Sequence, residues 1–88
     1  MAKIALEELS SPGCVHCMEF EKFWHSIEKD WPDVEYKKTM ITTPEGQDLV
    51  QKHMIFASPG IIIDSEVFST GGFNEEKFVA RLKELSGK

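Results

Sequence analysis

The spacing of proline and glycine constrains this chain more than any other sequence feature. These breakers stand at Pro12-Gly13, Pro32, Pro44, Pro59-Gly60 and Gly71-Gly72. Because each of them interrupts regular backbone structure, the chain must fold as a series of brief strands and helices. The pattern of apolar residues between the breakers then predicts which type each segment adopts.

The first half of the chain has the pattern of strand, helix, strand. Residues 3–9 carry Ile4, Leu6 and Leu9 and run into a breaker loop, which is typical of a short strand. From Cys14 to about Lys29, apolar residues recur at spacings of three and four, which predicts an amphipathic helix ended by Pro32. Its apolar face comprises Phe20, Phe23, Trp24, Ile27 and Trp31. Residues 34–41 alternate apolar and charged side chains and predict a second strand.

The second half predicts a helix, two strands and a last helix. Thr43 and Pro44 provide an N-cap and a first helical residue for a helix that runs to about His53. The apolar β-branched residues 61–63 suit a strand buried on both faces, and residues 66–70 complete a hairpin with it. After the paired glycines, Asn74 caps a helix whose apolar face is formed by Phe78, Val79, Leu82 and Leu85.

The resulting element order is βαβαββα. We expect an α/β fold in which three helices cover a four-stranded sheet, because apolar helix faces must be buried against another layer. The sequence shows no internal repeat, linker or low-complexity segment. With 88 residues, of which 41% are hydrophobic, we expect a single domain over residues 1–88.

Charge and composition exclude several functional classes. The formal net charge is -5, from 15 acidic and 10 basic residues, and the basic residues are not clustered, so neither nucleic acid nor a membrane surface is an expected partner. Glu7 and Glu8 interrupt the first apolar run, and no later segment resembles a membrane span. We therefore expect a cytoplasmic protein. Two cysteines are too few for a disulfide-rich secreted scaffold.

The motif Cys14-Val15-His16-Cys17 places two thiols at the start of the first predicted helix. Residues three apart are neighbours on a helix face, and the positive N-terminal end of the helix favours a thiolate. We expect Cys14 to attack a substrate disulfide and Cys17, which is more buried, to resolve the mixed disulfide. An imidazolium at His16 would further favour the Cys14 thiolate and make the pair more oxidising.

A lone C-x-x-C motif has other interpretations. It could be half of a zinc site, two ligands of an iron–sulfur cluster, or a pair of structural thiols in a non-catalytic interaction domain. Only His16, His25 and His53 could complete a zinc site, and no second C-x-x-C motif exists. The surrounding strand–helix pattern favours redox chemistry without a metal.

The C-x-x-C motif after the first strand, Ser58-Pro59 before the third and Gly71-Gly72 after the fourth together resemble the thioredoxin superfamily, over essentially the whole chain. The resemblance implies a thioredoxin fold with a mixed four-stranded sheet. It also implies a monomeric thiol–disulfide oxidoreductase that needs no organic cofactor or metal and acts on disulfides of proteins or small molecules. In this family a cis-proline lies against the cysteines, and Pro59, preceded by Ser58, occupies that position.

Further resemblances concern the partners and a buried acid. The short chain resembles glutaredoxin, in which the residues at Gly71, Gly72, Phe73 and Asn74 would bind glutathione. Cys-Val-His-Cys, however, is similar to the C-x-H-C of disulfide oxidases, and Asn74 stands where glutaredoxins usually have an aspartate. The reductant could therefore be either glutathione or a thioredoxin-reductase-type protein. Glu8, six residues before Cys14, matches the spacing of the buried acid of thioredoxin and could accept the Cys17 proton.

Overall fold

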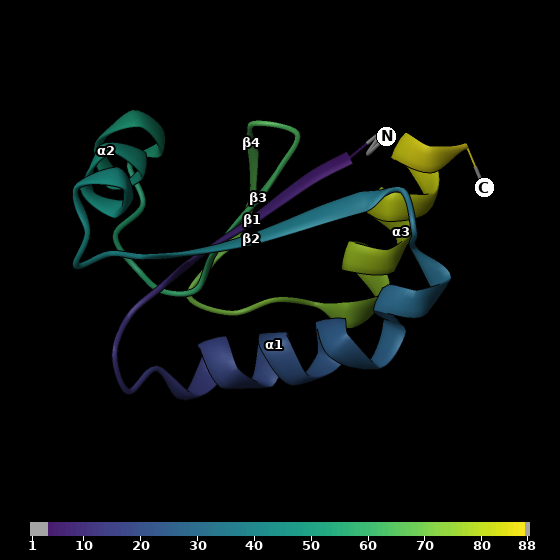
Figure 1. Ribbon diagram of the computed structural model, residues 1–88, viewed down its shortest axis with the longest axis horizontal. Coiled ribbons are helices and arrows are strands. Elements are labelled where there is room, and N and C mark those ends of the chain that lie inside the picture. Colours follow the sequence, from purple (N-terminus) through teal and green to yellow (C-terminus); the bar gives the residue numbers. More distant parts are fainter. Residues whose placement is uncertain (1–3, 88) are drawn as a thin grey trace.

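The computed structural model describes residues 4–87 and contains the seven predicted elements in the predicted order. They are β1 (Ile4–Ser10), α1 (Val15–Ile27), β2 (Val34–Met40), α2 (Pro44–His53), β3 (Gly60–Ile63), β4 (Glu66–Thr70) and α3 (Glu75–Ser86) (Figure 1). A short 3₁₀ helix, η1 (Glu28–Asp30), follows α1. No helix within residues 4–87 is long and apolar enough to cross a membrane.

The four strands form one mixed sheet in the order β2-β1-β3-β4. The β1–β2 pair is parallel, and the β1–β3 and β3–β4 pairs are antiparallel. A parallel pair needs a crossover connection, which α1 provides. In this register Glu8 of β1 lies opposite Lys38 of β2 and Ile61 of β3, so both neighbouring strands surround it.

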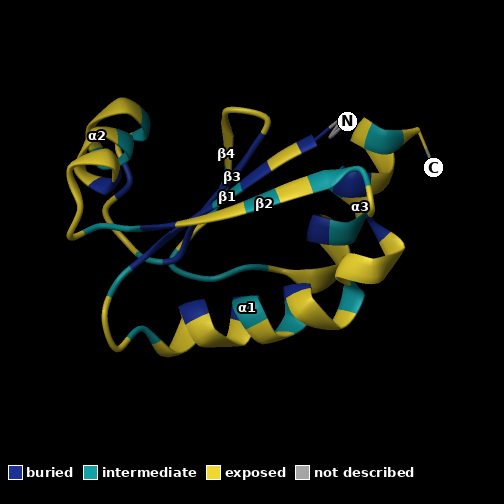
Figure 2. Ribbon diagram, in the orientation of Figure 1, coloured by how far each residue is buried: buried dark blue, intermediate teal, exposed yellow. Residues whose placement is uncertain are grey.

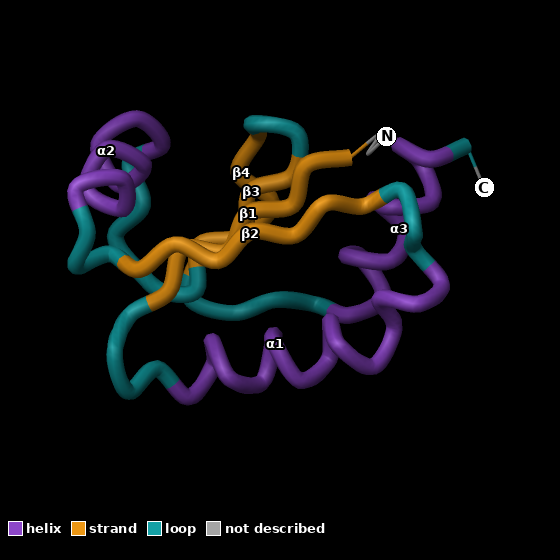
Figure 3. The backbone as a smooth tube through the Cα atoms, in the orientation of Figure 1, coloured by secondary structure: helices purple, strands orange, loops and turns teal. Residues whose placement is uncertain are grey.

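Helices cover both faces of the sheet (Figures 1 and 3). On one face α1 and α3 pack against alternate residues of β1 and β3, and this larger core consists of Ile4, Leu6, Phe20, Trp24, Trp31, Ile61, Ile63, Phe78 and Leu82. On the other face lies α2, above a smaller core of Leu9, Ile55 and Ile62. Figure 2 shows the buried residues along the sheet and the exposed ones on the outer faces of the helices. The two cores follow from the alternation of side chains along each strand.

The first helix differs from the prediction at both ends. Cys14 is its N-cap, with extended backbone, rather than its first helical residue. At the other end α1 stops at Ile27, and η1 with the buried Trp31 completes the segment before Pro32. A residue before proline is disfavoured in the helical region, and Trp31 accordingly leaves it, with φ -127° and ψ 62°.

The other boundaries agree with the sequence within one residue. The Thr43 side chain accepts a hydrogen bond from the Gly46 N–H at the start of α2, and Asn74 accepts one from the Lys77 N–H at the start of α3. Strand β1 extends through Ser10, β2 ends at Met40, and β3 begins at Gly60. Lys3, expected to begin the first strand, lies outside the described residues.

Candidate active site

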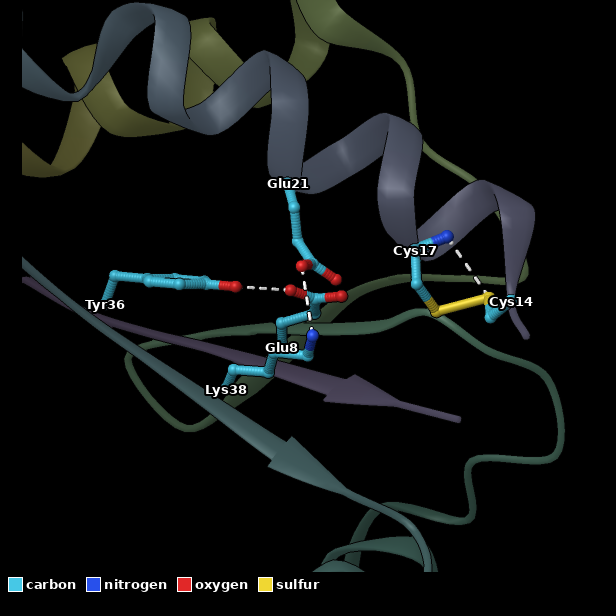
Figure 4. A network of polar contacts seen from close by, with 6 residues as sticks. All are labelled: Glu8, Cys14, Cys17, Glu21, Tyr36 and Lys38. Atoms are coloured by element: carbon cyan, nitrogen blue, oxygen red, sulfur yellow. Dashed lines mark hydrogen bonds and ion pairs between the residues drawn. A yellow bond between two sulfur atoms is a disulfide. The ribbon is translucent and has the colours of Figure 1, made fainter. Parts of the chain in front are cut away.

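Cys14 and Cys17 form a disulfide at the N-terminus of α1, with their Cα atoms 5.2 Å apart (Figure 4). The loop Ser11-Pro12-Gly13 turns the chain from β1 into the helix, and Gly13 has a φ of +70°. As the N-cap residue, Cys14 accepts a hydrogen bond at its sulfur from the Cys17 N–H, at 3.1 Å. The free N–H groups and positive end of the helix dipole therefore meet the Cys14 sulfur, where they stabilise a negative charge.

The two cysteines differ in exposure. Cys17, in the first turn of α1, is 1% exposed, whereas Cys14 is half-buried. A substrate therefore reaches Cys14 first, and Cys17 is placed to react within the molecule. The predicted difference in burial is confirmed.

The loop before β3 lies against Cys14. The Ser58 hydroxyl donates a hydrogen bond to the Cys14 sulfur at 3.4 Å, although the two residues are 44 positions apart. The Ser58–Pro59 peptide bond is cis, as the family resemblance implied. The Pro59 carbonyl accepts a hydrogen bond from the Gly71 N–H at 3.0 Å, and Gly71 has a φ of +77° that favours glycine. The Cys14 loop, the Pro59 loop and the end of β4 thus meet.

Glu8 is buried on the face of β1 that α1 covers, at 0% exposure. The Tyr36 hydroxyl donates a hydrogen bond to Glu8 Oε1 at 2.5 Å. In Figure 4 the other carboxyl oxygen points toward the cysteine pair, and Glu21 of α1 lies close to the same group. Glu21 in turn pairs with Lys38 of β2, at 3.0 Å between Oε1 and Nζ. The burial of Glu8 that the resemblance to thioredoxin implied is therefore confirmed.

These surroundings raise the pKa of Glu8 to about 7. Burial is the main cause, because it disfavours the charged carboxylate, and the nearby Glu21 carboxyl acts in the same direction. The Tyr36 hydrogen bond and the Lys38 charge oppose the increase. Burial and the adjacent Glu8 also raise the pKa of Tyr36, so this hydroxyl stays protonated and remains a donor. Glu8 can therefore take up or release a proton near neutral pH.

His16 lies on the outer surface of α1. Its Nδ1 is 3.2 Å from Glu19 Oε1, and the two side chains are 65% and 60% exposed. The partner that the structure gives the imidazole is thus a carboxylate on its own helix rather than a cysteine sulfur. Water and salt would therefore partly screen any electrostatic effect of His16 on the Cys14 thiolate.

Within residues 4–87, no group of three or more His, Cys, Asp and Glu side chains could hold a metal ion. The same part of the chain contains the disulfide described above, which uses both cysteines.

Comparison with known proteins adds sequence and fold relatives. No protein-family model matches the chain. A thioredoxin of Methanocaldococcus jannaschii is 29% identical over 86 residues, covering 94% of this chain and 96% of the relative. This similarity, together with the C-x-x-C disulfide, supports a place for the chain in the thioredoxin/glutaredoxin superfamily.

Solved structures agree with this assignment at the level of the fold. Thioredoxin O2 of Arabidopsis thaliana superposes with a TM-score of 0.75 at 14% identity, covering 96% of this chain and 76% of that one. Fasciola hepatica thioredoxin gives a TM-score of 0.73 at 19% identity, with 94% and 81% covered. The thioredoxin relative and the Cys14–Cys17 disulfide together support thiol–disulfide oxidoreductase activity for this chain.

The segment expected from glutaredoxins to bind glutathione has structural contacts in this chain. The Phe73 ring packs edge-on against Phe20, at 5.1 Å between ring centroids, and also contacts Phe23. The Asn74 side chain caps α3. Gly71 and Gly72 are half-buried beside the Pro59 loop. A role of these four residues in substrate binding stays a prediction.

Apolar side chains are exposed around the thioredoxin-like active site. Val15 and Met18 on α1 are 61% and 60% exposed, and Met54 and Phe56 before the Pro59 loop are 71% and 84% exposed. Phe56 also lines a hollow of about 230 Å³, whose other lining residues are Leu9, Ile41, Gln47, Val50, Ile55, Ala57 and Ser58. Because Ser58 contacts Cys14, the hollow adjoins the disulfide.

Sequence reasoning missed four residues of the site, namely Ser11, Glu21, Tyr36 and Lys38. Tyr36 and Lys38 lie on the same strand two residues apart, so they share a face, and the parallel pairing sets Lys38 opposite Glu8. The parallel pairing of the first two strands was therefore a signal that could have indicated Tyr36 and Lys38. Ser11 and Glu21 carried no comparable signal, because their contacts depend on how α1 and the Pro59 loop dock.

Proposed function

We propose that this protein reduces or exchanges disulfides of protein substrates, with Cys14 as nucleophile and Cys17 as resolving thiol. The observation that carries the proposal is the unequal exposure of two linked sulfurs at a helix N-terminus. A structural disulfide has no need of one accessible sulfur, whereas exchange requires it.

The reaction starts from the dithiol. The Cys14 thiolate attacks one sulfur of the substrate disulfide, the substrate S–S bond breaks, and the released sulfur takes up a proton. Cys14 is now joined to the substrate in a mixed disulfide. Cys17, as a thiolate, then attacks the Cys14 sulfur, so that the Cys14–Cys17 disulfide forms and the second substrate sulfur leaves. Two electrons pass from the protein to the substrate.

Glu8 is the proposed proton acceptor for Cys17. A buried thiol is a weak acid and must lose its proton before it attacks. The Glu8 carboxyl points toward the pair, and its pKa of about 7 is suited to proton exchange at neutral pH. Tyr36 holds the other carboxyl oxygen, which leaves one oxygen available for this step.

The exposed apolar side chains support polypeptide substrates. An apolar residue beside the substrate cysteine would fit the hollow next to Ser58, where Ile55 and Phe56 line the wall. Such contacts contribute through the burial of apolar surface. Peptides with leucine next to their disulfide should therefore be reduced faster than peptides with aspartate there.

The proposed reductant is a thioredoxin-reductase-type protein rather than glutathione, and the proposed state is a cytoplasmic monomer. The Phe73 ring packs against Phe20 and the Asn74 Oδ1 caps α3, so both side chains serve the fold itself, which supports this choice. His16, Ser58, Pro59, Gly71 and Gly72 complete the proposed site.

The test is turnover of insulin disulfides by the purified protein, with dithiothreitol, glutathione or a thioredoxin reductase as electron source. The proposal expects reduction that is lost in Cys14→Ser. Turnover that persists in this variant would refute Cys14 as the nucleophile. Comparison of the electron sources decides the reductant separately.

A further inference from the structure

Three residues form a closed set of hydrogen bonds at the edge of the disulfide. The Cys14 N–H donates to the Ser11 carbonyl at 3.3 Å. The hydroxyls of Ser11 and Ser58 are 2.7 Å apart, and the Ser58 hydroxyl lies 3.4 Å from the Cys14 sulfur. Ser11 thus contacts Cys14 through its backbone and Ser58 through its side chain.

The direction of these hydrogen bonds follows from the number of available protons. A serine hydroxyl has one hydrogen to donate and can accept two hydrogen bonds. Ser58 donates its hydrogen to the Cys14 sulfur, so Ser11 must be the donor between the two hydroxyls. Acceptance from Ser11 polarises the Ser58 O–H bond and strengthens its donation to sulfur, because hydrogen bonds in a chain reinforce one another.

We propose that Ser58 is a catalytic residue that stabilises the Cys14 thiolate through its hydroxyl, and that Ser11 is a positioning residue that orients this hydroxyl. The inference rests on the proposed nucleophilic role of Cys14. In the reduced protein the thiolate form of Cys14 carries a negative charge on its sulfur, so the same contact becomes a charge-assisted hydrogen bond that stabilises the thiolate relative to the thiol.

The serine hydrogen bonds and the helix N-terminus reach the Cys14 sulfur from different sides. The Cys17 N–H reaches the Cys14 sulfur from α1, and Ser58 reaches it from the Pro59 loop. A thiolate is thus held by donors from two segments that are distant in sequence. Both serines are uncharged and half-buried, so salt screens their contribution less than it screens that of the exposed His16.

The test is the pH dependence of iodoacetamide alkylation at Cys14 in the reduced full-length protein, with the modified peptide identified by mass. Only the thiolate reacts, so the midpoint of the profile gives the acidity of the thiol. Ser58→Ala should raise the midpoint by about one pH unit, and Ser11→Ala by about half a unit, as expected for loss of hydrogen bonds to a charged acceptor. Ser11→Thr, which keeps a hydroxyl, should restore the original midpoint.

A double-mutant cycle tests whether Ser11 acts through the Ser58 hydroxyl or independently of it. In the Ser58→Ala background, Ser11→Ala should cause no further change, because the hydroxyl it orients is absent. Ser26→Ala is the matched control, since that hydroxyl bonds the Phe23 carbonyl on α1, and it should leave the midpoint unchanged. The ionisable side chains on the elements that surround the pair stay the same in every variant: Glu8 on β1, His16, Glu19 and Glu21 on α1, and Tyr36 and Lys38 on β2.

Two outcomes would overturn the inference. An unchanged midpoint in Ser58→Ala would show that the hydroxyl does not stabilise the thiolate. Equal effects of Ser11→Ala in the presence and absence of the Ser58 hydroxyl would refute the positioning role. Alkylation does not depend on turnover, so an absence of disulfide reduction would contradict the proposed function and leave this measurement interpretable.

Discussion

Cys14 and Cys17 are three residues apart, yet their sulfurs have different surroundings. Cys14 lies at the helix N-terminus, half-exposed, with hydroxyl and N–H donors around it. Cys17 is buried, on the side toward which the Glu8 carboxyl points. Donors stabilise an existing thiolate, whereas a carboxylate base removes a proton from a thiol. The fold therefore suits one sulfur for attack and the other for delayed deprotonation.

The largest expected effect is the loss of nucleophilic attack on the substrate disulfide when Cys14 is replaced. Cys14→Ser should lower insulin-disulfide turnover by about a thousandfold or more, because an alcohol replaces the nucleophile. Initial rates in the turbidity assay measure this loss. Ser26→Ala, which removes a hydroxyl bonded to the Phe23 carbonyl within α1, is the control and should retain most of the rate. A Cys14→Ser rate within tenfold of the unmodified protein would contradict the assignment of roles.

Cys17→Ser should affect a later step. The Cys14 thiolate still attacks, but without a resolving thiol the mixed disulfide accumulates, and most of the protein should be recovered joined to substrate. Non-reducing electrophoresis followed by mass spectrometry measures the adduct. If Cys14→Ser trapped substrate equally well, the two sulfurs would be interchangeable and the comparison above would fail.

Glu8→Gln should stabilise the oxidised protein at high pH. Burial raises the pKa of Glu8 to about 7 from an ordinary 4.5, so the folded state binds more protons than the unfolded state between these values. Ionising the buried carboxyl therefore lowers the free energy of unfolding as pH rises, by about 3 kcal/mol above pH 7. The variant lacks this loss, so the gain should appear at pH 8 and vanish below pH 4.5.

Urea unfolding at pH 4.5, 6 and 8 measures this difference, with Glu7→Gln on the adjacent, half-buried position as control. A gain of equal size at all three pH values would show that the carboxyl does not titrate as described. The same Glu8→Gln substitution should slow release of the mixed disulfide while leaving the initial attack by Cys14 unaffected.

Glu21→Gln should lower the pKa of Glu8, which is a smaller change than removal of the Glu8 carboxyl itself. Removing a nearby negative charge makes the charged form of Glu8 easier to form, so the pKa of Glu8 should fall below about 7. Carboxyl carbon NMR of the oxidised protein follows this titration. Glu19→Gln on the outer side of α1 is the matched control. A rise in the pKa of Glu8 would contradict this prediction. It would mean that Lys38, once released from its ion pair with Glu21, no longer lowers the pKa of Glu8.

The smallest effect is expected for His16→Val. Loss of a potential cation near Cys14 should make the pair more reducing, but the ring is largely exposed and faces Glu19, so the potential should change by less than about 30 mV. Equilibration with glutathione buffers measures this. A much larger change would place the imidazole in the site during reaction.

Local signals predicted the elements well because they depend on neighbouring residues. Thr43 with Pro44 marks the start of α2, Asn74 marks the start of α3, and alternation along β1 predicts that Glu8 faces inward. The C-terminal end of α1 was predicted less accurately, because its apolar periodicity continues into the 3₁₀ helix η1.

The surroundings of the cysteines could not be predicted in the same way. The Ser11–Ser58 hydrogen bond joins positions 47 apart, and the Tyr36–Glu8 hydrogen bond joins positions 28 apart. Such contacts depend on the docking of loops and strands, which local periodicity does not describe. The C-x-x-C motif therefore predicts the chemistry, and the tertiary structure shows what distinguishes its two sulfurs.

The most direct test of the account is a redox titration of the Cys14–Cys17 pair against glutathione buffers, with both thiols followed by alkylation and mass spectrometry. A catalytic Cys14–Cys17 disulfide should give one reversible two-electron transition, between about -270 and -120 mV, in which both thiols disappear together. Thiols that respond independently, or a pair that stays oxidised throughout this range, would contradict a catalytic disulfide.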